Sequence, residues 1–362
     1  MKILTVHSWY SKNEKHRSAV DGWRCARPLE QLAKNMPDWT IDHQPTFIKG
    51  VEKYKDAKEF TPQEMEKAYK IICKYDVVFS SYHADPTAYS MLKVAAKNAG
   101  VKFIMDVDDD MFSVNPDNPF WIKMDDEKCY WMQCMIRDNE YISTTTDKLA
   151  KVFRDRREHP PETVFVNPNY IPDIYKHPKF DNGDDIVIGY FGGSSHYKDI
   201  HDTGVIEAVE RIMHEHRNVR FKAVGMVVDK YLPGARYEFV EGKRGDGWVK
   251  EIYPDLKMDI SLGPLDNNIF NNGKSNIKWQ ESTRAGACFV ASNFGPYDSL
   301  KPDTAVLVPQ NTPDDWYNAI KPLVEDKKLI KQYVKNAQEE LNNWRLESNW
   351  QQYKKMFESV VK

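Results

Sequence analysis

The sequence has few cysteines and no long apolar run, and both shortages limit what the protein can be. No apolar stretch approaches the roughly 20 residues that cross a bilayer, and the first eight residues turn polar too soon for a signal peptide. The cysteines are an odd number without paired metal-ligand spacing: Cys25, Cys73, Cys129, Cys134 and Cys288. Reduced thiols are typical of the cytoplasm. We therefore expect a cytoplasmic protein without membrane insertion.

The chain also lacks an excess of charge of either sign. It has 51 Lys and Arg against 54 Asp and Glu, a net charge of −3, so no global field attracts nucleic acid. No G-x-G-x-x-G motif follows the first strand of either half, which argues against a dinucleotide oxidoreductase. What remains is a globular chain of 362 residues, long enough for two domains.

Short apolar runs alternate with helical stretches, a pattern typical of parallel sheets covered on both faces. The expected strands are 2–6, 41–47, 76–80, 102–106, 142–144, 164–166, 186–191, 219–224, 237–240, 258–262, 288–291 and 306–308. The expected helices are 27–34, 62–74, 86–99, 203–216, 274–285, 314–325, 326–343 and 344–361.

A segment rich in Pro, Asp and Asn, 168–185, separates the two series of strands and reads as a linker. The pattern predicts an α/β fold of two Rossmann-like domains that face each other across a cleft. The N-terminal domain spans 1–170 and is joined by a returning C-terminal helix, 345–362, while the C-terminal domain spans 171–344. Because the carboxyl ends of the strands meet at the cleft, we expect the binding site there.

The first candidate site is a glycine-rich loop directly after the strand 186–191. It consists of Gly192, Gly193, Ser194, Ser195 and His196. Glycines at a strand end let the backbone approach a ligand, and free N–H groups and serine hydroxyls bind phosphate. Lys198 lies nearby and favours an anion. A plain tight turn is the alternative interpretation.

The second candidate is the start of the helix expected at 274–285. Gly273 and Ser275 mark a helix start, where the dipole, the free N–H groups and Lys274 would favour a diphosphate. Lys278 and Glu281 follow at helical spacing on the same face, and Glu281 can accept hydrogen bonds from ribose hydroxyls. The alternative is a solvated face with a surface ion pair.

The run GKSNIKWQESTRAGACFVASNFGPY, 273–297, resembles the donor signature of GT-B glycosyltransferases in the large retaining family that includes sucrose and glycogen synthases. IGYFGGSSHYKDI, 188–200, resembles the first donor-domain loop of that family. The likeness is to a phage or bacterial subgroup. Glu281 matches the second of two family glutamates, whereas Lys274 stands where the first is expected.

The resemblance implies an enzyme that moves a hexosyl or pentosyl group from a nucleoside-diphosphate sugar to a hydroxyl, with retention and without a metal or other cofactor. Lys278 and Glu281 would then be catalytic. The acceptor would be a glycan or glycoconjugate, or a hydroxymethylated pyrimidine in DNA, which would make the reaction a DNA modification. We expect a monomer or weak dimer. The departure at Lys274 leaves a non-catalytic nucleotide-sugar-binding protein as an alternative.

The acceptor side is expected on the N-terminal half, where an acidic cluster, 106–110, follows the strand 102–106. Asp108 and Asp109 would orient the acceptor hydroxyl or accept its proton. A Mg²⁺ or Mn²⁺ site and a purely structural turn are the alternatives. Three further cleft candidates are Arg17 and Arg24 in the polar loop 7–27, and His83.

Overall fold

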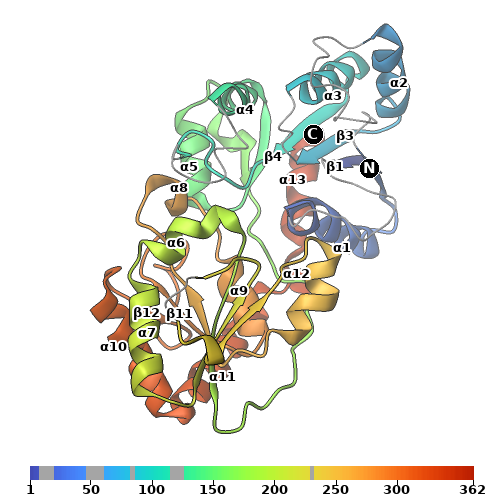
Figure 1. The fold of residues 1–362 in the computed structure, drawn as a ribbon. Coiled ribbons are helices and arrows are strands. Elements are labelled where there is room, and N and C mark those ends of the chain that lie inside the picture. Colours follow the sequence, from blue (N-terminus) through green and yellow to red (C-terminus); the bar gives the residue numbers. More distant parts are fainter. Residues whose placement is uncertain (8–19, 46–60, 82–85, 115–125, 229–231) are drawn as a thin grey trace.

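The computed structural model describes residues 1–7, 20–45, 61–81, 86–114, 126–228 and 232–362. Its core consists of two parallel sheets of six strands each, one from either half of the chain (Figure 1). This confirms the expected pair of Rossmann-like α/β sheets. No helix in the described part of the chain has the length and apolar character needed to cross a lipid bilayer.

The first sheet has the strand order β2-β1-β3-β4-β5-β6. Its strands are β1 (Lys2–His7), β2 (Thr40–Pro45), β3 (Val77–Ser81), β4 (Lys102–Asp106), β5 (Tyr141–Thr144) and β6 (Val164–Val166). Successive strand residues point to opposite faces. In β3, Val78 therefore packs with helices on one face, while Val77 and Phe79 pack on the other.

Helices cover both faces of this sheet. Those whose residues share a core with Val78 are α2 (Pro62–Ile72), α3 (Pro86–Ala99), α4 (Asp126–Asp138) and α5 (Asp147–Asp155), and the opposite face holds α1 (Arg27–Asn35). Thr61 caps α2 in a capping box with Glu64. Helices α4 and α5 were not predicted, although the Thr146 side chain caps α5 by accepting from Leu149 N.

The second sheet has the order β12-β11-β10-β7-β8-β9, the Rossmann arrangement within this half. Its strands are β7 (Ile186–Phe191), β8 (Val219–Val224), β9 (Tyr237–Val240), β10 (Ile260–Gly263), β11 (Cys288–Ser292) and β12 (Val306–Val308). Its helices are α6 (Tyr197–His201), α7 (Val205–Glu215), α8 (Ile269–Asn272), α9 (Ile277–Arg284), α10 (Pro313–Glu325) and α11 (Lys327–Leu341).

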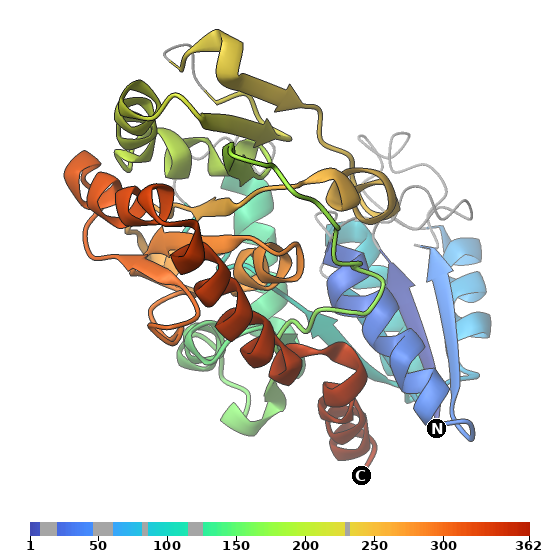
Figure 2. The same cartoon turned by 90° about the horizontal axis from the view of Figure 1, so that it is seen from below.

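The end of the chain returns to the first sheet, as expected (Figure 2). Phe357 of α13 (Gln351–Val361) meets Phe79 of β3 with ring centroids 5.6 Å apart. The expected single helix 344–361 is wrong, however. Arg345 adopts an extended backbone and bridges to Ile171, so a short helix, α12 (Leu346–Asn349), precedes α13.

One further expectation fails near the N-terminus. The segment Asp21–Ala26 is a buried π-helix that runs directly into α1, whereas a polar loop was expected over 7–27. Trp23, Cys25 and Ala26 are buried there with Asp21 and Arg24. The polar residues of this segment thus belong to the interior.

Candidate functional site

The site lies where the order of the second sheet reverses. Strands β7 and β10 are neighbours, yet the chain leaves them toward opposite sides, to β8 and to β11. In open α/β sheets such a switch point creates a crevice at the carboxyl ends of the strands. The loop 192–196 follows β7 and the segment 264–276 follows β10, so the two predicted donor segments meet at this point.

Glycines bring the loops after β7, β8 and β9 into close contact. Gly192 N donates to Val224 O at 3.0 Å, and Gly225 N donates to Val240 O at 2.9 Å. A Cβ on Gly225 would lie 2.7 Å from Gly192 O, and Gly225 has a φ of +86°. No atom of the described residues lies within 4 Å of the place where a Cβ of Gly193 would be, so that part of the structure leaves the backbone open to a ligand there.

Replacing Gly225 by alanine should therefore lower the free energy of unfolding by more than about 2 kcal/mol, because the change combines a left-handed backbone with a clash against Gly192 O. Chemical denaturation measures the loss. Gly193→Ala is the matched control and should unfold like the wild type, since its Cβ enters open space. Equal stability of the two variants would show that the loops do not require a glycine at Gly225.

His196 ends the turn that leads into α6, and its ring is held by Asp199. Nδ1 of His196 lies 2.7 Å from Oδ2 of Asp199. Oδ1 of Asp199 accepts from Asp266 N at 2.9 Å and from Asn271 Nδ2 at 2.8 Å. Burial lowers the pKa of His196 to about 4, and Lys274 and Lys278 act in the same direction. Asp199 thus ties the loop after β7 to the loop after β10.

Two lysines lie near the entrance to α9, and neither has an ion-pair partner among the residues that the structure describes. Lys274 Nζ is 4.9 Å from the centre of the Phe270 ring, and Lys278 Nζ is 4.2 Å from that of Tyr190. Burial lowers the pKa of Lys278 to about 8, with Lys274 adding to the effect. Cation–π contacts hold both ammonium groups without neutralising them, so positive charge remains for an anion.

Glu281 lies one turn further along α9 and is 7% exposed. It therefore does not lie on a solvated helix face, which was the alternative interpretation. Trp248 Nε1 donates to its Oε1 at 3.0 Å, and the Tyr175 hydroxyl is also hydrogen-bonded to the carboxyl group. Burial raises the pKa of Glu281 to about 7, although these hydrogen bonds and Lys278 oppose the shift. Glu281 is therefore positioned by aromatic donors.

Gly273 and Ser275, expected at the helix start, lie instead at the junction of the two halves. Helix α9 begins at Ile277, so both precede it. Gly273 O accepts from Thr146 Oγ1 at 3.0 Å, and Ser275 Oγ accepts from Asn169 Nδ2 at 2.8 Å. Their polar groups hold the N-terminal half and the linker against the donor segment.

Arg24 does not reach an open surface, contrary to its predicted place on the acceptor side. It is fully buried, and its guanidinium donates to both carboxylate oxygens of Asp106 at 2.9 and 2.8 Å. It also donates to Asn167 O and Asn169 Oδ1. All of these partners are internal, so we assign Arg24 to the scaffold. Arg17, His83 and the Ser194 side chain lie outside the described residues.

The acidic segment after β4 faces the donor segment. Asp110 Cβ lies 3.8 Å from the place where a Cβ of Gly273 would be. Oδ1 of Asp108 is buried without a hydrogen-bond partner in the described protein, and burial together with Asp109 and Asp106 raises the Asp108 pKa to about 8. Asp106 is engaged by Arg24, and within the described ranges no three His, Cys, Asp or Glu side chains gather as metal ligands.

Some residues of the site were not predicted. Asp199 could have been found from the sequence, because it follows His196 by three positions, a spacing at which the two side chains can meet, as they do here. Trp248 and Tyr175 could not have been found in this way. They come from the segment after β9 and from the linker, and only the fold brings them to Glu281.

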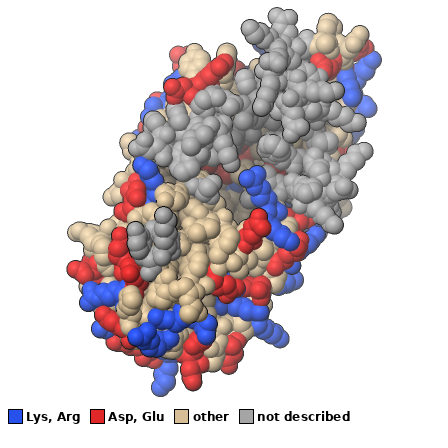
Figure 3. Space-filling view, viewed as in Figure 1, with Lys and Arg blue, Asp and Glu red and all other residues tan. Residues whose placement is uncertain are grey.

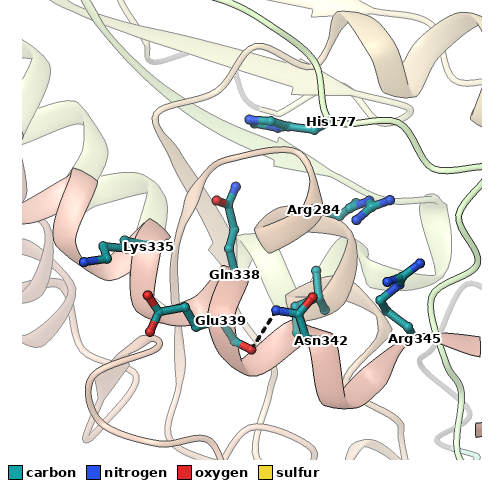
Figure 4. A pocket seen from close by; sticks show the side chains of 8 residues that line it. His177, Arg284, Lys335, Gln338, Glu339, Asn342 and Arg345 are labelled. Atoms are coloured by element: carbon teal, nitrogen blue, oxygen red, sulfur yellow. Dashed lines mark hydrogen bonds between the residues drawn. The ribbon is translucent and has the colours of Figure 1, made fainter. Parts of the chain in front are cut away.

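A cavity of about 440 Å³ lies away from this site and is shown in Figure 4. It lies beside the carboxyl end of α9 and the end of α11, and Arg284 and Arg345 line it. Both arginines are paired with Asp173, which neutralises part of their charge. These two arginines therefore have less charge available for an anion than Lys274 and Lys278, which have no ion-pair partner in the described structure.

The sequence matches no family model and no curated protein, but its structure is similar to solved ones. HepE of Anabaena in complex with UDP has a TM-score of 0.66 at 13% identity, over 99% of this chain and 100% of that chain. Sucrose-phosphate synthase of Thermosynechococcus elongatus has 0.64 at 14%, over 99% of each. A glycosyltransferase of Rickettsia africae has 0.65 at 13%, over 100% and 98%. The protein therefore has the GT-B fold.

Proposed function

We propose that this protein is a glycosyltransferase that moves a hexosyl or pentosyl group from a nucleoside-diphosphate sugar to an acceptor hydroxyl. The observation that carries the proposal is the position of Lys274 and Lys278, two lysines without an ion-pair partner in the described structure, at the switch point of the second sheet. The open backbone at Gly193 lies in the loop after the neighbouring strand. Solved neighbours with this fold bind UDP and UDP-glucose, which supports a nucleotide-sugar donor.

The main chemical task would be to stabilise the departing diphosphate. The ammonium groups of Lys274 and Lys278 would oppose its charge, and the amides of 192–195 would donate to its oxygens. In this proposal the lysines take the role that a divalent metal has in other transferases, so the transfer needs no metal. Retention of the anomeric configuration follows from the resemblance of 273–297 and is tested by the proton NMR couplings of the product.

Glu281 would hold the nucleoside by accepting from the ribose hydroxyls. Its carboxyl group is fixed by Trp248 and Tyr175, so a ribose would meet a carboxylate that needs no reorientation. The segments 225–226 and 240–244 would flank the base, because Gly225 and Gly242 bring the ends of β8 and β9 together beside Gly192.

On the acceptor side, Asp108 would orient the hydroxyl or take its proton, since its unpaired Oδ1 lies in the segment that faces Gly273. The acceptor would be a glycan or glycoconjugate, or a hydroxymethylated pyrimidine in DNA. On the face seen in Figure 3, the described charges of both signs are interspersed over the domain of the second sheet. Binding to duplex DNA that falls steeply with salt would favour the DNA base.

A panel of UDP, GDP, dTDP and ADP sugars tests the proposal. A true donor should raise the melting temperature of the protein, and incubation with it should release free nucleoside diphosphate. Binding without release would favour the alternative of a non-catalytic nucleotide-sugar-binding protein. If no member of the panel binds, the proposed donor class is wrong.

The affinity for UDP should be highest between about pH 7 and pH 8. Glu281 has a pKa of about 7 and accepts from ribose hydroxyls best when ionised, so binding strengthens as the pH rises through that value. Lys278 has a pKa of about 8 and loses its charge above it, so binding weakens there, by up to about tenfold per pH unit.

Calorimetric titration of UDP at several pH values measures this profile. The Glu281→Gln variant should lose the acidic limb and the Lys278→Met variant the alkaline limb. The prediction fails if both variants keep the profile of the wild type, because other groups would then set it.

A further inference from the structure

The further inference concerns the pair His196 and Asp199, and it rests on the proposed function. We propose that His196 accepts a hydrogen bond at Nε2 from a hydroxyl group of the substrates, and that it does not bind phosphate. The hydroxyl belongs either to the sugar of the donor or to the acceptor. His196 would thus bind a hydroxyl group, while Lys274 and Lys278 bind the diphosphate.

The hydrogen bonds around Asp199 fix which nitrogen of His196 carries the proton. An ionised carboxylate only accepts hydrogen bonds. Asp199 uses Oδ1 for Asp266 N and Asn271 Nδ2, and it uses Oδ2 for Nδ1 of His196 at 2.7 Å. The proton in that last contact therefore belongs to Nδ1. Although burial by itself would raise the pKa of Asp199, its hydrogen bond with His196 and the nearby charges lower it, which keeps the carboxylate ionised.

Nε2 is the ring nitrogen of His196 that does not face Asp199. With the proton on Nδ1, a neutral imidazole has a lone pair at Nε2. Burial and the positive charges of Lys274 and Lys278 disfavour the imidazolium, against the opposite effect of Asp199. The side chain is 21% exposed, and Nδ1 makes its one side-chain hydrogen bond within the described structure. Nε2 is thus left as an acceptor for a ligand.

The lone pair of Nε2 decides which ligand group His196 can bind. Phosphate oxygens that carry charge are acceptors, and two acceptors without a proton between them repel each other. A hydroxyl has a proton to donate and fits the lone pair of Nε2. Sugars and acceptor alcohols both offer hydroxyls, whereas the diphosphate of the donor does not. An orienting carboxylate behind the ring also keeps the tautomer fixed, as a positioned base requires.

The Asp199→Asn variant tests the tautomer directly. Oδ1 of the new amide can still accept from Asp266 N and Asn271 Nδ2, which turns its NH₂ group toward Nδ1 of His196. That nitrogen must then accept, so the proton moves to Nε2 and the acceptor is lost. Asp202→Asn is the matched control, because Asp202 is exposed three residues further on and its side chain has no partner in the described structure.

UDP and UDP-glucose are the ligands for the binding measurements. The rate of UDP release is measured with UDP-glucose in buffer, where water is the acceptor. We expect Asp199→Asn and His196→Ala to bind UDP within about twofold of the wild type and to lose about tenfold either in affinity for UDP-glucose or in the rate of UDP release. Loss of affinity assigns the hydroxyl to the donor sugar, and loss of rate alone assigns it to the acceptor. His196→Gln keeps an acceptor oxygen near Nε2 and should recover part of the loss.

Two results would overturn the inference. If UDP itself binds more weakly by the same factor, His196 contacts the nucleotide and not the sugar or the acceptor, and if all variants match the wild type, Nε2 contacts no substrate. Melting temperatures identify any variant that has lost its fold, and His196→Ala then serves in place of Asp199→Asn. A wild-type protein that binds no member of the nucleotide-sugar panel would contradict the proposed function itself, which separates that failure from this one.

Discussion

Replacing Lys278 by methionine should slow the release of nucleoside diphosphate from the donor by about 10²- to 10³-fold, the usual cost of removing one preorganised charge from a transition state. Methionine keeps the length of the side chain and its packing on Tyr190 but removes the ammonium group, which lies 4.2 Å from that ring. Because the wild-type charge has no ion-pair partner in the described structure, it is available to the departing diphosphate, and its loss leaves Lys274 as the remaining lysine of the pair.

Two controls accompany this prediction. Lys278→Arg keeps the charge and should retain more activity than Lys278→Met. Lys331→Met makes the same replacement on the exposed face of α11, where the side chain has no partner in the described structure, and should leave the rate unchanged. Each variant should melt like the wild type. If Lys278→Met turns over at the normal rate, the donor diphosphate is stabilised elsewhere and the proposed site is wrong.

The elements that the sequence predicts best are the buried parallel strands. Strands β4, β7 and β8 have the expected bounds, because a strand covered on both faces is a short apolar run between polar turns. The edge strands β6 and β9 also have the expected bounds. The glycine loop after β7 and the lysines before and on α9 follow from the same logic, since parallel strands carry their ligand loops at one end. This part of the site is local in sequence.

What the sequence does not reveal depends on contacts between distant residues. Arg24 was expected at the cleft in a polar loop, yet it is buried against Asp106, which lies 82 positions away in the sequence. Ser275 was expected at a helix start, but its Oγ accepts from Asn169 of the linker, a contact that the local pattern does not indicate. In both cases a polar side chain that is free in the local pattern has a partner far away in the sequence: Asp106 binds Arg24 within the N-terminal domain, and Asn169 binds Ser275 across the junction of the two halves.

Removing Arg24 should produce the largest loss of stability. Arg24→Ala leaves the carboxylate of Asp106 buried without its two hydrogen bonds, and it also removes the donor to Asn167 O and Asn169 Oδ1. Breaking such a pair by deleting one partner costs about 3–5 kcal/mol, because the remaining charge has no compensation. Denaturant unfolding measures the loss.

The matched control is Arg220→Ala. Arg220 pairs with Asp185 at 2.5 Å, but the two side chains are 54% and 37% exposed, and such a pair contributes only about 0–1 kcal/mol. The double variant Arg24→Met, Asp106→Leu should recover much of the loss, because it removes the buried charge together with its partner. If Arg24→Ala unfolds at the same denaturant concentration as Arg220→Ala, water reaches Asp106 and the pair is not the buried anchor that the structure shows.

The consequence should extend to the donor site, because Asn169 connects the two. It accepts from Arg24, donates to Ser275 Oγ at 2.8 Å, and its carbonyl accepts from Gln280 Nε2 of α9 at 2.8 Å. Without Arg24 this asparagine loses one of its fixed partners, so the start of α9 and Lys278 become less well positioned. Arg24→Ala should therefore weaken UDP binding at a temperature where it is still folded, although Arg24 itself contacts no ligand, and Arg220→Ala should not.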